Sequence, residues 1–575
     1  MNRLSANLWM YLCMKAIVCL FIFSLMQPLG GQAQVPSLSK DQWKNDLAYM
    51  MATIDSTHPS PYAKLSKAKF DKAAADLARD IPHLTAAQIA ARMMQIVARL
   101  GDGHSHLAPV GLNRWFPIRC YLFTDGLFIT AIEPALQEFL GSKVMKIGSL
   151  DVKNALAVAQ SLKGSDNRFG EMENCVLYLF NADLLEALGI ISGANQITLE
   201  IERPNGTART TITLRSQTVE KQSNWMEWGE MYGPVPDLMT SFGKRVSSDF
   251  RKGDATLPLH LRMRLPYWFK YLTESKSVYF QFNFVEREWN HVTFEGFTKS
   301  LFAFIDANDV GKFIMDVRYN SGGDGSLLDP FLHEIIKRDK INRKGTLFVL
   351  VGRKTFSAAV MLIGSLKRHT NAYFVGEPAG APLNHRGEAQ SYPLPNSKFI
   401  LQLSTLYYQV GGPQDRSEYF QVDFPSQFSS GQYFSGADPA LELVLRNDLK
   451  NLCDALLENS QEAVAALRRV EEMKKEYAWY TPFSETEMNA TGYHLLRAGR
   501  LAESITAFLL NTKSYPGSWN TWDSLAEAFL KAGNIRLAIE NYKRSLELNP
   551  GNLAARQAIE KLTRICQPFN APIRY

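Results

Sequence analysis

The spacing of apolar residues changes along the chain and divides it into segments of different predicted structure. Residues 40–100 contain no glycine and carry apolar residues at helical spacing, which is typical of amphipathic helices packed on one another. These apolar positions are Leu47, Met50, Met51, Ile54, Phe70, Ala73, Leu77, Ile89, Met93, Ile96, Val97 and Leu100. We therefore expect a small helical cap of three helices in this segment.

Residues 115–215 follow a different pattern of short apolar runs. Leu127–Ile132 and Ile197–Ile201 are examples, and Gly, Asp and Asn separate such runs, which is typical of strands joined by turns. The pattern predicts a mixed sheet with one or two helices. Residues 141–148, followed by Val152 and the helical stretch 155–157, have the pattern of a degenerate PDZ-like module.

From Ser277 onward the pattern alternates between strands and helices. Strands are expected at 278–282, 312–317, 346–351 and 372–375, and helices near 293–308, 327–338 and 357–367. Such alternation predicts right-handed crossovers and a largely parallel sheet. Functional sites in these sheets lie at the carboxyl ends of the strands.

The C-terminal part contains an internal repeat with a period of 34 residues. The matched pairs are Ala498-Gly499 with Ala532-Gly533, Leu501 with Ile535, Ile505 with Ile539, Phe508 with Tyr542, and Pro516 with Pro550. This period resembles the tetratricopeptide repeat, a pair of helices that stacks with its neighbours and leaves a concave face. Two repeats are expected over residues 484–552, with a capping helix over 553–566. The resemblance implies a possible protein partner on this face and gives no ligand.

Composition places the chain among multidomain globular proteins. Hydrophobic residues make up 46% of its 575 residues, with 37 Gly and 26 Pro, so a disordered, collagen-like or low-complexity chain is excluded. The net charge is +6. Because no dense run of Lys or Arg is present, we expect no nucleic-acid partner.

The first 33 residues have the pattern of a secretory signal peptide. Arg3 and Lys15 precede the apolar run 16–26, and Gly31-Gln32-Ala33 supplies small residues at cleavage-site spacing. A secreted or periplasmic protein is therefore expected, with no stable membrane span once the leader is removed. The alternative is an uncleaved N-terminal anchor, because apolar residues begin again at Leu8.

The cysteines that follow the leader are far apart in the sequence. They are Cys120, Cys175, Cys453 and Cys566, and no two are closer than 55 residues. This spacing excludes a zinc knuckle and a dense disulfide scaffold. One or two bridges are possible, and buried free thiols are the favoured interpretation.

Ser357 is the first residue whose position suggests chemistry. It follows an apolar strand and a short loop, 352–356, and it begins a predicted helix. The unpaired N–H groups and the dipole at a helix N-terminus favour a negative charge, as an oxyanion requires. The alternative is a helix cap, for which Ser is among the best residues; this position alone favours the cap.

A loop with three glycines ends the preceding strand, at residues 316–325. Glycine lets a backbone N–H turn outward and lets a substrate approach closely. A phosphate-binding loop is the competing interpretation. Because no Gly-Lys-Ser/Thr follows and the spacing of a dinucleotide motif is absent, a nucleotide site is not favoured.

A serine nucleophile needs a base, and the loop 101–106 offers His104. His104 stands between a glycine and a small polar residue at the junction of two segments. His106 and His385 are the alternatives. A lone loop histidine is more often simply solvated, so the assignment depends on the other features.

Taken together, these segments resemble the tail-specific (carboxy-terminal processing) and tricorn-core serine peptidases. The matching blocks, in the family's order, are Leu100–Ser105, Asp316-x-Arg318-x-Asn320-x-Gly322-Gly323, Thr355–Ala359, Val375–Pro378 and Gly436–Glu442. The resemblance covers about residues 40–450. It implies Ser357 as nucleophile and the backbone N–H groups of Gly322 and Ala358 as oxyanion donors. It also implies a PDZ-like module and a crotonase-like α/β core.

The chain departs from the processing peptidases at the base. Their lysine lies in a Gly-Lys-Gly turn after the Gly-Glu segment, but here residues 376–382 contain no lysine. Lys367 lies near the far end of the Ser357 helix and cannot replace it. The tricorn-like branch instead takes a histidine after the cap, which implies His104. Its neighbouring serine falls on Gly103, and the family's glutamate has no secure match, so Glu388 is proposed as the orienting carboxylate.

The resulting prediction is a secreted serine peptidase of multidomain α/β fold, which needs no metal or organic cofactor and acts on a peptide or unfolded protein. A catalytically inactive binding protein on the same fold is the alternative. The expected organisation is a signal peptide (1–33), helical cap (34–110), PDZ-like module (111–216), connecting segment (217–276), catalytic core (277–450), helical linker (451–483), and repeats with a capping helix (484–566).

Overall fold

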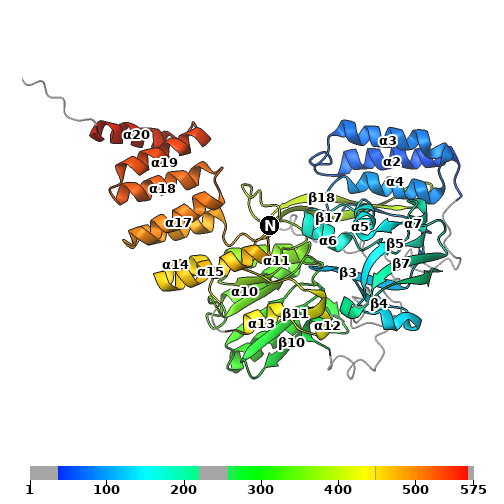
Figure 1. Ribbon diagram of the computed structural model, residues 1–575, viewed down its shortest axis with the longest axis horizontal. Helices are drawn as coiled ribbons and strands as arrows, with labels where there is room; N and C mark the ends of the chain where they lie inside the picture. Colours follow the sequence, from blue (N-terminus) through cyan, green and yellow to red (C-terminus); the bar gives the residue numbers. More distant parts are fainter. Residues whose placement is uncertain (1–36, 207, 219–256, 263–264, 447–448, 567–575) are drawn as a thin grey trace, which may run out of the picture.

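The computed structural model describes the chain apart from residues 1–36, 207, 219–256, 263–264, 447–448 and 567–575. The predicted signal peptide and much of the predicted connecting segment therefore lie outside the described residues. The rest forms a mixed α/β structure of several parts (Figure 1).

Three amphipathic helices form the first part, as the apolar spacing predicted. They are α2 (Lys40–Thr57), α3 (Lys67–Asp80) and α4 (Ala86–Ala98). Ser39 and Thr85 begin α2 and α4 with capping boxes, in which side chain and backbone satisfy each other's free polar groups. The buried faces, with Met50, Phe70 and Met93 almost fully enclosed, share one core.

A six-stranded antiparallel sheet forms the second part, with strand order β3-β4-β5-β7-β8 and with β6 paired to β5 off this path. Alternate residues of β7 and β8 are buried, as a half-buried sheet requires. The elements are β3 (Ile118–Phe123), β4 (Gly126–Ile132), β5 (Lys143–Ile147), β6 (Leu150–Asp151), α5 (Val152–Gln160), α6 (Arg168–Asn174), α7 (Ala182–Ala187), β7 (Gln196–Glu202) and β8 (Arg209–Arg215).

The third part is a six-stranded sheet of order β10-β11-β14-β15-β16-β19, parallel except for β10. Its strands are β10 (Tyr267–Leu272), β11 (Ser277–Phe282), β14 (Lys312–Asp316), β15 (Leu347–Val351), β16 (Tyr373–Gly376) and β19 (Phe424–Pro425). Its central strands are buried throughout, because helices cover both faces. The predicted alternation of strands and helices is present here.

Helices α9 (Phe294–Ala307), α10 (Leu328–Ile336) and α11 (Ala358–His369) pack on one face of this sheet. Helix α13 (Pro439–Leu445) packs on the other face. The two cores take alternate residues of one strand: Phe280 faces the first and Tyr279 the second. This arrangement places the carboxyl ends of β14 and β15 side by side.

A long hairpin of β17 (Asn384–Pro393) and β18 (Ile400–Gln409) pairs with β1 (His106–Ala108) to form a third sheet. The apolar spacing did not predict this hairpin. Phe399, Leu401 and Leu403 of the hairpin belong to the core of the three-helix part, so the hairpin joins that part to the parallel sheet. The remaining short elements are β2 (Arg114–Trp115), β9 (Gln217–Thr218), β12 (Glu288–Trp289), β13 (Val292–Thr293) and α12 (Ser430–Ser435).

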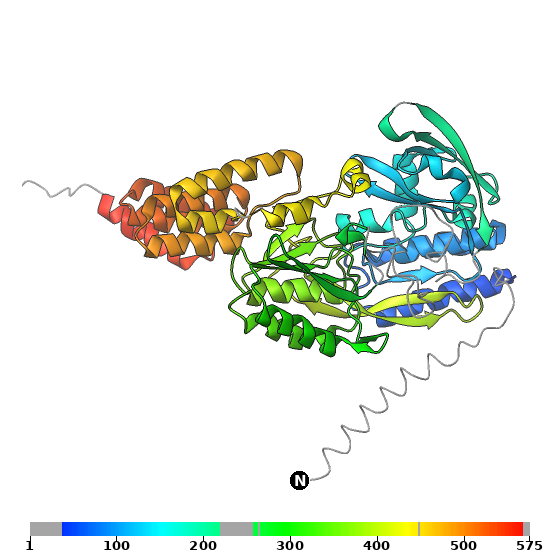
Figure 2. The same cartoon turned by 90° about the horizontal axis from the view of Figure 1, so that it is seen from below.

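The C-terminal part is helical, and Figure 2 shows it standing at one end of the molecule. Its helices are α14 (Leu452–Glu458), α15 (Ser460–Glu476), α16 (Glu485–Arg497), α17 (Leu501–Ser514), α18 (Trp519–Lys531), α19 (Ile535–Leu548) and α20 (Leu553–Cys566). From α16 to α20, each helix packs against the next. Gly499 and Gly533, one period apart, both adopt φ +77° just after a helix end, a conformation that glycine adopts without strain.

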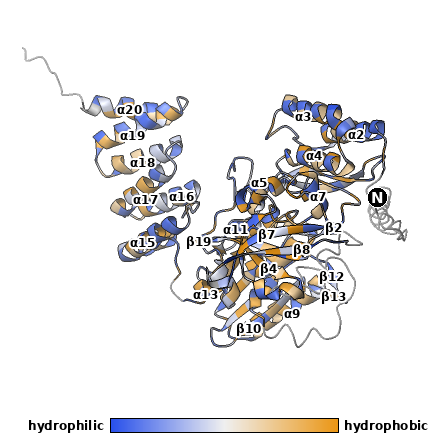
Figure 3. Cartoon of the chain, turned by 45° about the vertical axis from the view of Figure 1, so that its right-hand side comes forward, coloured by the Kyte–Doolittle hydropathy of each residue, from blue (hydrophilic) through white to orange (hydrophobic). Residues whose placement is uncertain are grey.

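Figure 3 shows apolar residues gathered in the two large sheets, with polar residues on the outer helices. Within the described part of the chain, no helix has both the length and the apolar character needed to cross a membrane. Cys120, Cys175 and Cys453 are free thiols, as the sequence favoured. The side chain of Cys566 is outside the described set.

Candidate active site

Ser357 lies at the turn between β15 and α11, directly before the first residue of the helix. Its backbone has φ +54° and ψ −126°, a conformation that costs a non-glycine residue about 1–3 kcal/mol. Its side chain makes no capping hydrogen bond. The hydroxyl therefore does not act as the helix cap that the position alone suggested. The next N–H, that of Ala358, is at the first helical position and has no intrahelical acceptor.

Gly322 lies against this turn. A Cβ placed on Gly322 would be 2.6 Å from Ser357 Cβ and 3.1 Å from Ala358 N, and the φ of Gly322 is +109°. Both the space and the conformation therefore require glycine here. The N–H of Gly322 donates a 2.9 Å hydrogen bond to Asn320 Oδ1. The structure thus brings together Ser357, Gly322 and Ala358.

A buried ion-pair group, formed by Arg318, Asp316 and Asp438, lies next to the Gly322 loop. Arg318 donates to Asp316 at the end of β14 and, with two nitrogens, to Asp438 at 2.7–2.8 Å. All three side chains are at most 8% exposed. Burial opposes ionisation of Asp438, but Arg318 and His260 outweigh it and hold the pKa of Asp438 below its usual range. This paired arrangement fixes the chain where β14 leads into the loop.

His104 reaches the same region from the loop before β1. Its ring stacks on Phe356, the neighbour of Ser357, with centroids 4.3 Å apart and planes 29° apart. Neither ring nitrogen of His104 has a hydrogen-bond partner among the described residues. Burial, and then the nearby His385, lower the pKa of His104 to about 4. The imidazole is therefore neutral at pH 7, although no hydrogen bond between His104 and Ser357 is present.

The position before His104 is occupied by Gly103, and its surroundings leave no room for the serine that the resemblance implies there. A Cβ on Gly103 would lie 2.7 Å from the ring of Phe356 and 3.1 Å from Asp166 Oδ2. The N–H of Gly103 donates to that same oxygen at 2.9 Å. Burial, and then the charge of Asp102, raise the pKa of Asp166 to about 7. The space that a serine side chain would need is filled by Phe356.

Asp102 holds this loop in place, a role that the sequence analysis did not assign. Its Oδ1 accepts hydrogen bonds from the N–H groups of His104 and Ser105, at 2.8 and 2.7 Å, and from Ser404 Oγ at 3.0 Å. Its Oδ2 lies 2.7 Å from His58 Nε2. Burial opposes ionisation, but the bonds from His58 and Ser105 outweigh it, so the pKa of Asp102 lies below its usual range. Asp102 is thus a buried carboxylate with four partners.

The other predicted histidines have backbone partners. His106 Nδ1 lies 3.2 Å from the carbonyl oxygen of His104, and burial lowers the pKa of His106 to about 3. His385 Nδ1 lies 3.1 Å from two carbonyl oxygens, those of Pro382 and Leu383. His385 is close to His104, with ring centroids 6.1 Å apart.

Glu388 lies on β17, exposed, with φ +54°. Its Oε2 accepts a 2.9 Å hydrogen bond from Tyr408 Oη. Within the described residues, no hydrogen bond or ion pair joins Glu388 to His104. Its neighbour Gly387 lies next to His104: a Cβ there would be 3.7 Å from His104 Cε1. The orienting role of Glu388 stays a prediction.

No protein-family model matches this chain, and no curated protein matches it. Solved structures do. Mature CPAF complexed with lactacystin is similar at 12% identity over 70% of this chain and 97% of that chain, with a TM-score of 0.48. The photosystem II D1 C-terminal processing protease is similar at 13% identity over 70% and 96%, with a TM-score of 0.33. The tricorn protease is similar at 11% identity over 71% and 36%, with a TM-score of 0.33.

These neighbours include a C-terminal processing protease and the tricorn protease.

Proposed function

We propose that this chain is a serine peptidase that cleaves peptide bonds by acyl transfer through Ser357. The observation that carries the proposal is the turn at Ser357. The backbone of Ser357 is strained and its hydroxyl makes no capping hydrogen bond. It faces Gly322, where a Cβ would collide with Ser357. Strain of this kind gathers at active sites, where surrounding contacts hold a reactive side chain in position.

His104 is the proposed base. Its ring is neutral at pH 7, it lies beside Phe356, and its nitrogens are not used by the described residues. A nucleophilic serine requires such a neutral acceptor within reach of its proton. Hydrogen bonds of this kind are often long before substrate binds and shorten in the complex, so the missing His104–Ser357 bond agrees with a substrate-free state.

Gly322 and Ala358 are the proposed oxyanion donors. Their backbones lie together at the turn, and the N–H of Ala358 is oriented by the helix start. The N–H of Gly322 donates to Asn320 Oδ1, so the proposal requires this N–H to exchange the amide oxygen for the substrate oxygen. Asn320 Nδ2 has no partner among the described residues, so no second side-chain hydrogen bond has to break when this exchange takes place.

In the proposed reaction, Ser357 Oγ forms a bond to the peptide carbonyl carbon while its proton passes to His104. The C–N bond then breaks, and His104 returns the proton to the leaving amine. Water attacks the ester carbon with His104 again as base, the C–O bond to Ser357 Oγ breaks, His104 returns the proton to Ser357 Oγ, and the acid product leaves. Glu388 would orient the imidazole.

The test is hydrolysis of a fluorescently labelled unfolded protein by residues 34–575. We expect Ser357→Ala and His104→Ala to reduce activity to background, a loss of about a thousandfold or more, and His106→Ala to retain activity. Activity lost in His106→Ala and kept in His104→Ala would move the base to His106. Full activity in Ser357→Ala would exclude the proposal.

The finer domain assignments belong to this proposal. The sheet of β3–β8 would be a PDZ-like module, the parallel sheet a crotonase-like core, and α16–α19 two tetratricopeptide repeats that bind a protein segment. The location would be secreted or periplasmic. Deletion of residues 484–575 separates these roles: peptidase activity that survives indicates targeting or assembly by the repeats, whereas its loss in a folded core would implicate them in catalysis.

A further inference from the structure

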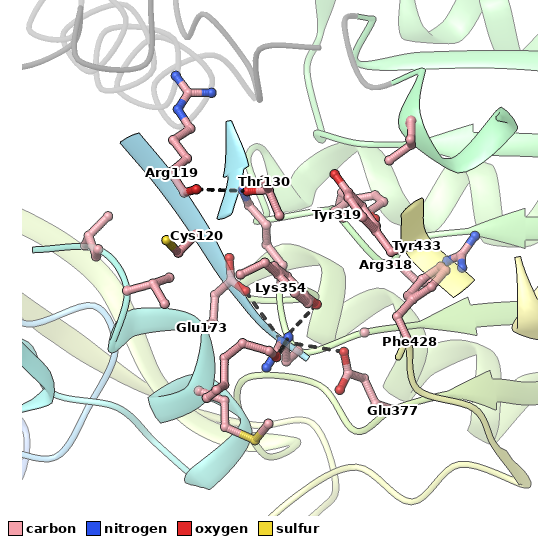
Figure 4. Close-up of a pocket in the computed structure, with 18 of the residues that line it drawn as sticks. Arg119, Cys120, Thr130, Glu173, Arg318, Tyr319, Lys354, Glu377, Phe428 and Tyr433 are labelled. Carbon is pink, nitrogen blue, oxygen red and sulfur yellow. Dashed lines mark hydrogen bonds and ion pairs between the residues drawn. The ribbon is translucent and has the colours of Figure 1, made fainter. Parts of the chain in front are cut away.

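A cavity of about 200 Å³ lies between β3 of the antiparallel sheet and the loop that follows β15 (Figure 4). Its walls are mainly apolar and aromatic and include Trp115, Phe116, Phe180, Tyr319 and Phe428. Ser357 and His104 are not among its lining residues. The cavity is therefore separate from the candidate active site, although it shares the 352–356 loop with it.

Arg353 lines this cavity and is 4% exposed. Its Nε donates to Tyr121 Oη at 3.1 Å, and its Nη2 donates to the carbonyl oxygen of Leu122 at 2.6 Å. Carboxylate oxygens of Glu173 and Glu377 lie 3.8 and 3.7 Å from Nε. The third nitrogen, Nη1, is buried and has no hydrogen-bond partner among the described residues. A buried N–H of a charged group without an acceptor is costly.

Lys354 also lines the cavity, together with two further arginines, Arg119 and Arg318. Burial lowers the pKa of Lys354, and the charge of Glu173 opposes this effect. Within the described residues, no hydrogen bond or ion pair of its ammonium is present. Arg318, also in the lining, differs because Asp316 and Asp438 neutralise it. An apolar cavity thus contains two adjacent residues with unused cationic donors.

We infer that this cavity binds a small amphipathic monocarboxylate. Its carboxylate would accept from Lys354 Nζ and Arg353 Nη1, and its apolar body would fill the aromatic walls. An apolar cavity of about 150 Å³ holds a benzene molecule, so this one suits a phenyl ring with a short chain. A dianion such as phosphate is disfavoured because the carboxylates of Glu173 and Glu377 lie beside Arg353.

The test is isothermal titration of residues 34–575 with 4-phenylbutyrate and with its uncharged counterpart, 4-phenylbutanol. Wild type should bind the carboxylate at least about tenfold more tightly than the alcohol, because a buried charge-assisted hydrogen bond is lost with the alcohol. Lys354→Met should reduce this preference, because only Arg353 Nη1 would remain as donor, and should leave binding of the alcohol unchanged. Lys398→Met is the matched control, because Lys398 is exposed and outside the cavity.

A second variant tests whether the compounds bind in this cavity. Val176 lines the cavity, and Val176→Trp should fill it and abolish binding of both compounds. Circular dichroism and thermal unfolding confirm that each variant is folded. Absence of binding to folded wild type at millimolar concentrations, an unchanged preference in Lys354→Met, or unchanged binding in folded Val176→Trp would each overturn the inference. Because binding should persist in Ser357→Ala, this result is independent of peptidase activity.

Discussion

The imidazole of His58 and the carboxylate of Asp102 lie 2.7 Å apart, and both side chains are fully buried. The same carboxylate holds the backbone N–H of His104. A residue of the helical cap therefore helps to fix the loop that carries the proposed base. Removal of one partner from a buried pair leaves an uncompensated polar or charged group, which is more costly than loss of an exposed pair.

We predict that Asp102→Ala lowers the free energy of unfolding by about 3–5 kcal/mol. Because the folded-state pKa of Asp102 is lowered, its contribution is present above the unfolded pKa of about 4 and is lost as pH falls below it. Urea unfolding at pH 7 measures the loss, and the difference in stability between wild type and variant should shrink progressively as the pH is lowered below about 4. Glu295→Gln is the control, because Glu295 forms an exposed pair with Lys299 and should change stability by less than about 0.5 kcal/mol. An equal effect of the two variants would contradict the prediction.

Gly322→Ala should lower kcat/KM by about a hundredfold or more, because the added Cβ would collide with Ser357 and displace the turn. Gly412→Ala is a matched control: Gly412 also has a positive φ, +89°, but a Cβ there meets nothing within 4 Å. That control should lose some stability and keep its kcat/KM. Activity assays with thermal unfolding of both variants make the comparison, and a fully active Gly322→Ala would count against the assigned role.

The pH dependence of kcat/KM should reflect the lowered pKa of His104, about 4. A base must be unprotonated, so activity should stay constant from pH 7 down to about 5 and fall tenfold per pH unit below about 4. An acid limb with its midpoint near 6.5, the ordinary histidine value, would show that the acting base is not buried in this way.

The free energy of unfolding should also depend on pH through His104. Between pH 6.5 and 4 the unfolded chain binds a proton at His104 that the folded chain does not, so stability should fall as pH falls through this window. His106 and His385, whose pKa values are also lowered, contribute in the same direction. His104→Ala should therefore show a shallower loss of stability between pH 6.5 and 4 than wild type, as measured by urea unfolding.

Arg318→Met should destabilise the fold by about 3–5 kcal/mol, because Asp316 and Asp438 would remain buried without their cation. Arg536→Met removes an arginine whose partner, Glu540, is exposed, and it should cost less than about 1 kcal/mol. Denaturant unfolding of the two variants gives the comparison. Equal stabilities would mean that the Arg318 group does not hold the loop of Gly322.

Local pattern was enough to predict the elements that follow a regular period. The helices of residues 40–98 and the strands β11, β14, β15 and β16 were expected from apolar spacing, because burial of one face or of both faces leaves a repeating signal. The turn at Ser357 was expected for the same reason: a buried strand followed by a helix fixes where the connecting loop lies.

Contacts between distant segments were not predicted. Ser404 Oγ donates to Asp102, 302 residues away in the sequence, and the β17–β18 hairpin that brings it there was missed. Burial alternates only over the first four residues of each strand and is irregular beyond them, so the period-2 pattern is too short to predict the hairpin. His58 and Asp102 were present in the sequence without an assigned role, because only the fold shows that they meet.

The most direct test of the account is labelling of residues 34–575 with a fluorophosphonate probe, with the adduct located by peptide mass. The account predicts one labelled residue, Ser357, with labelling absent from Ser357→Ala and reduced to background in His104→Ala. A well-folded wild type that is not labelled, or that is labelled elsewhere, would contradict the claim that Ser357 is an activated nucleophile.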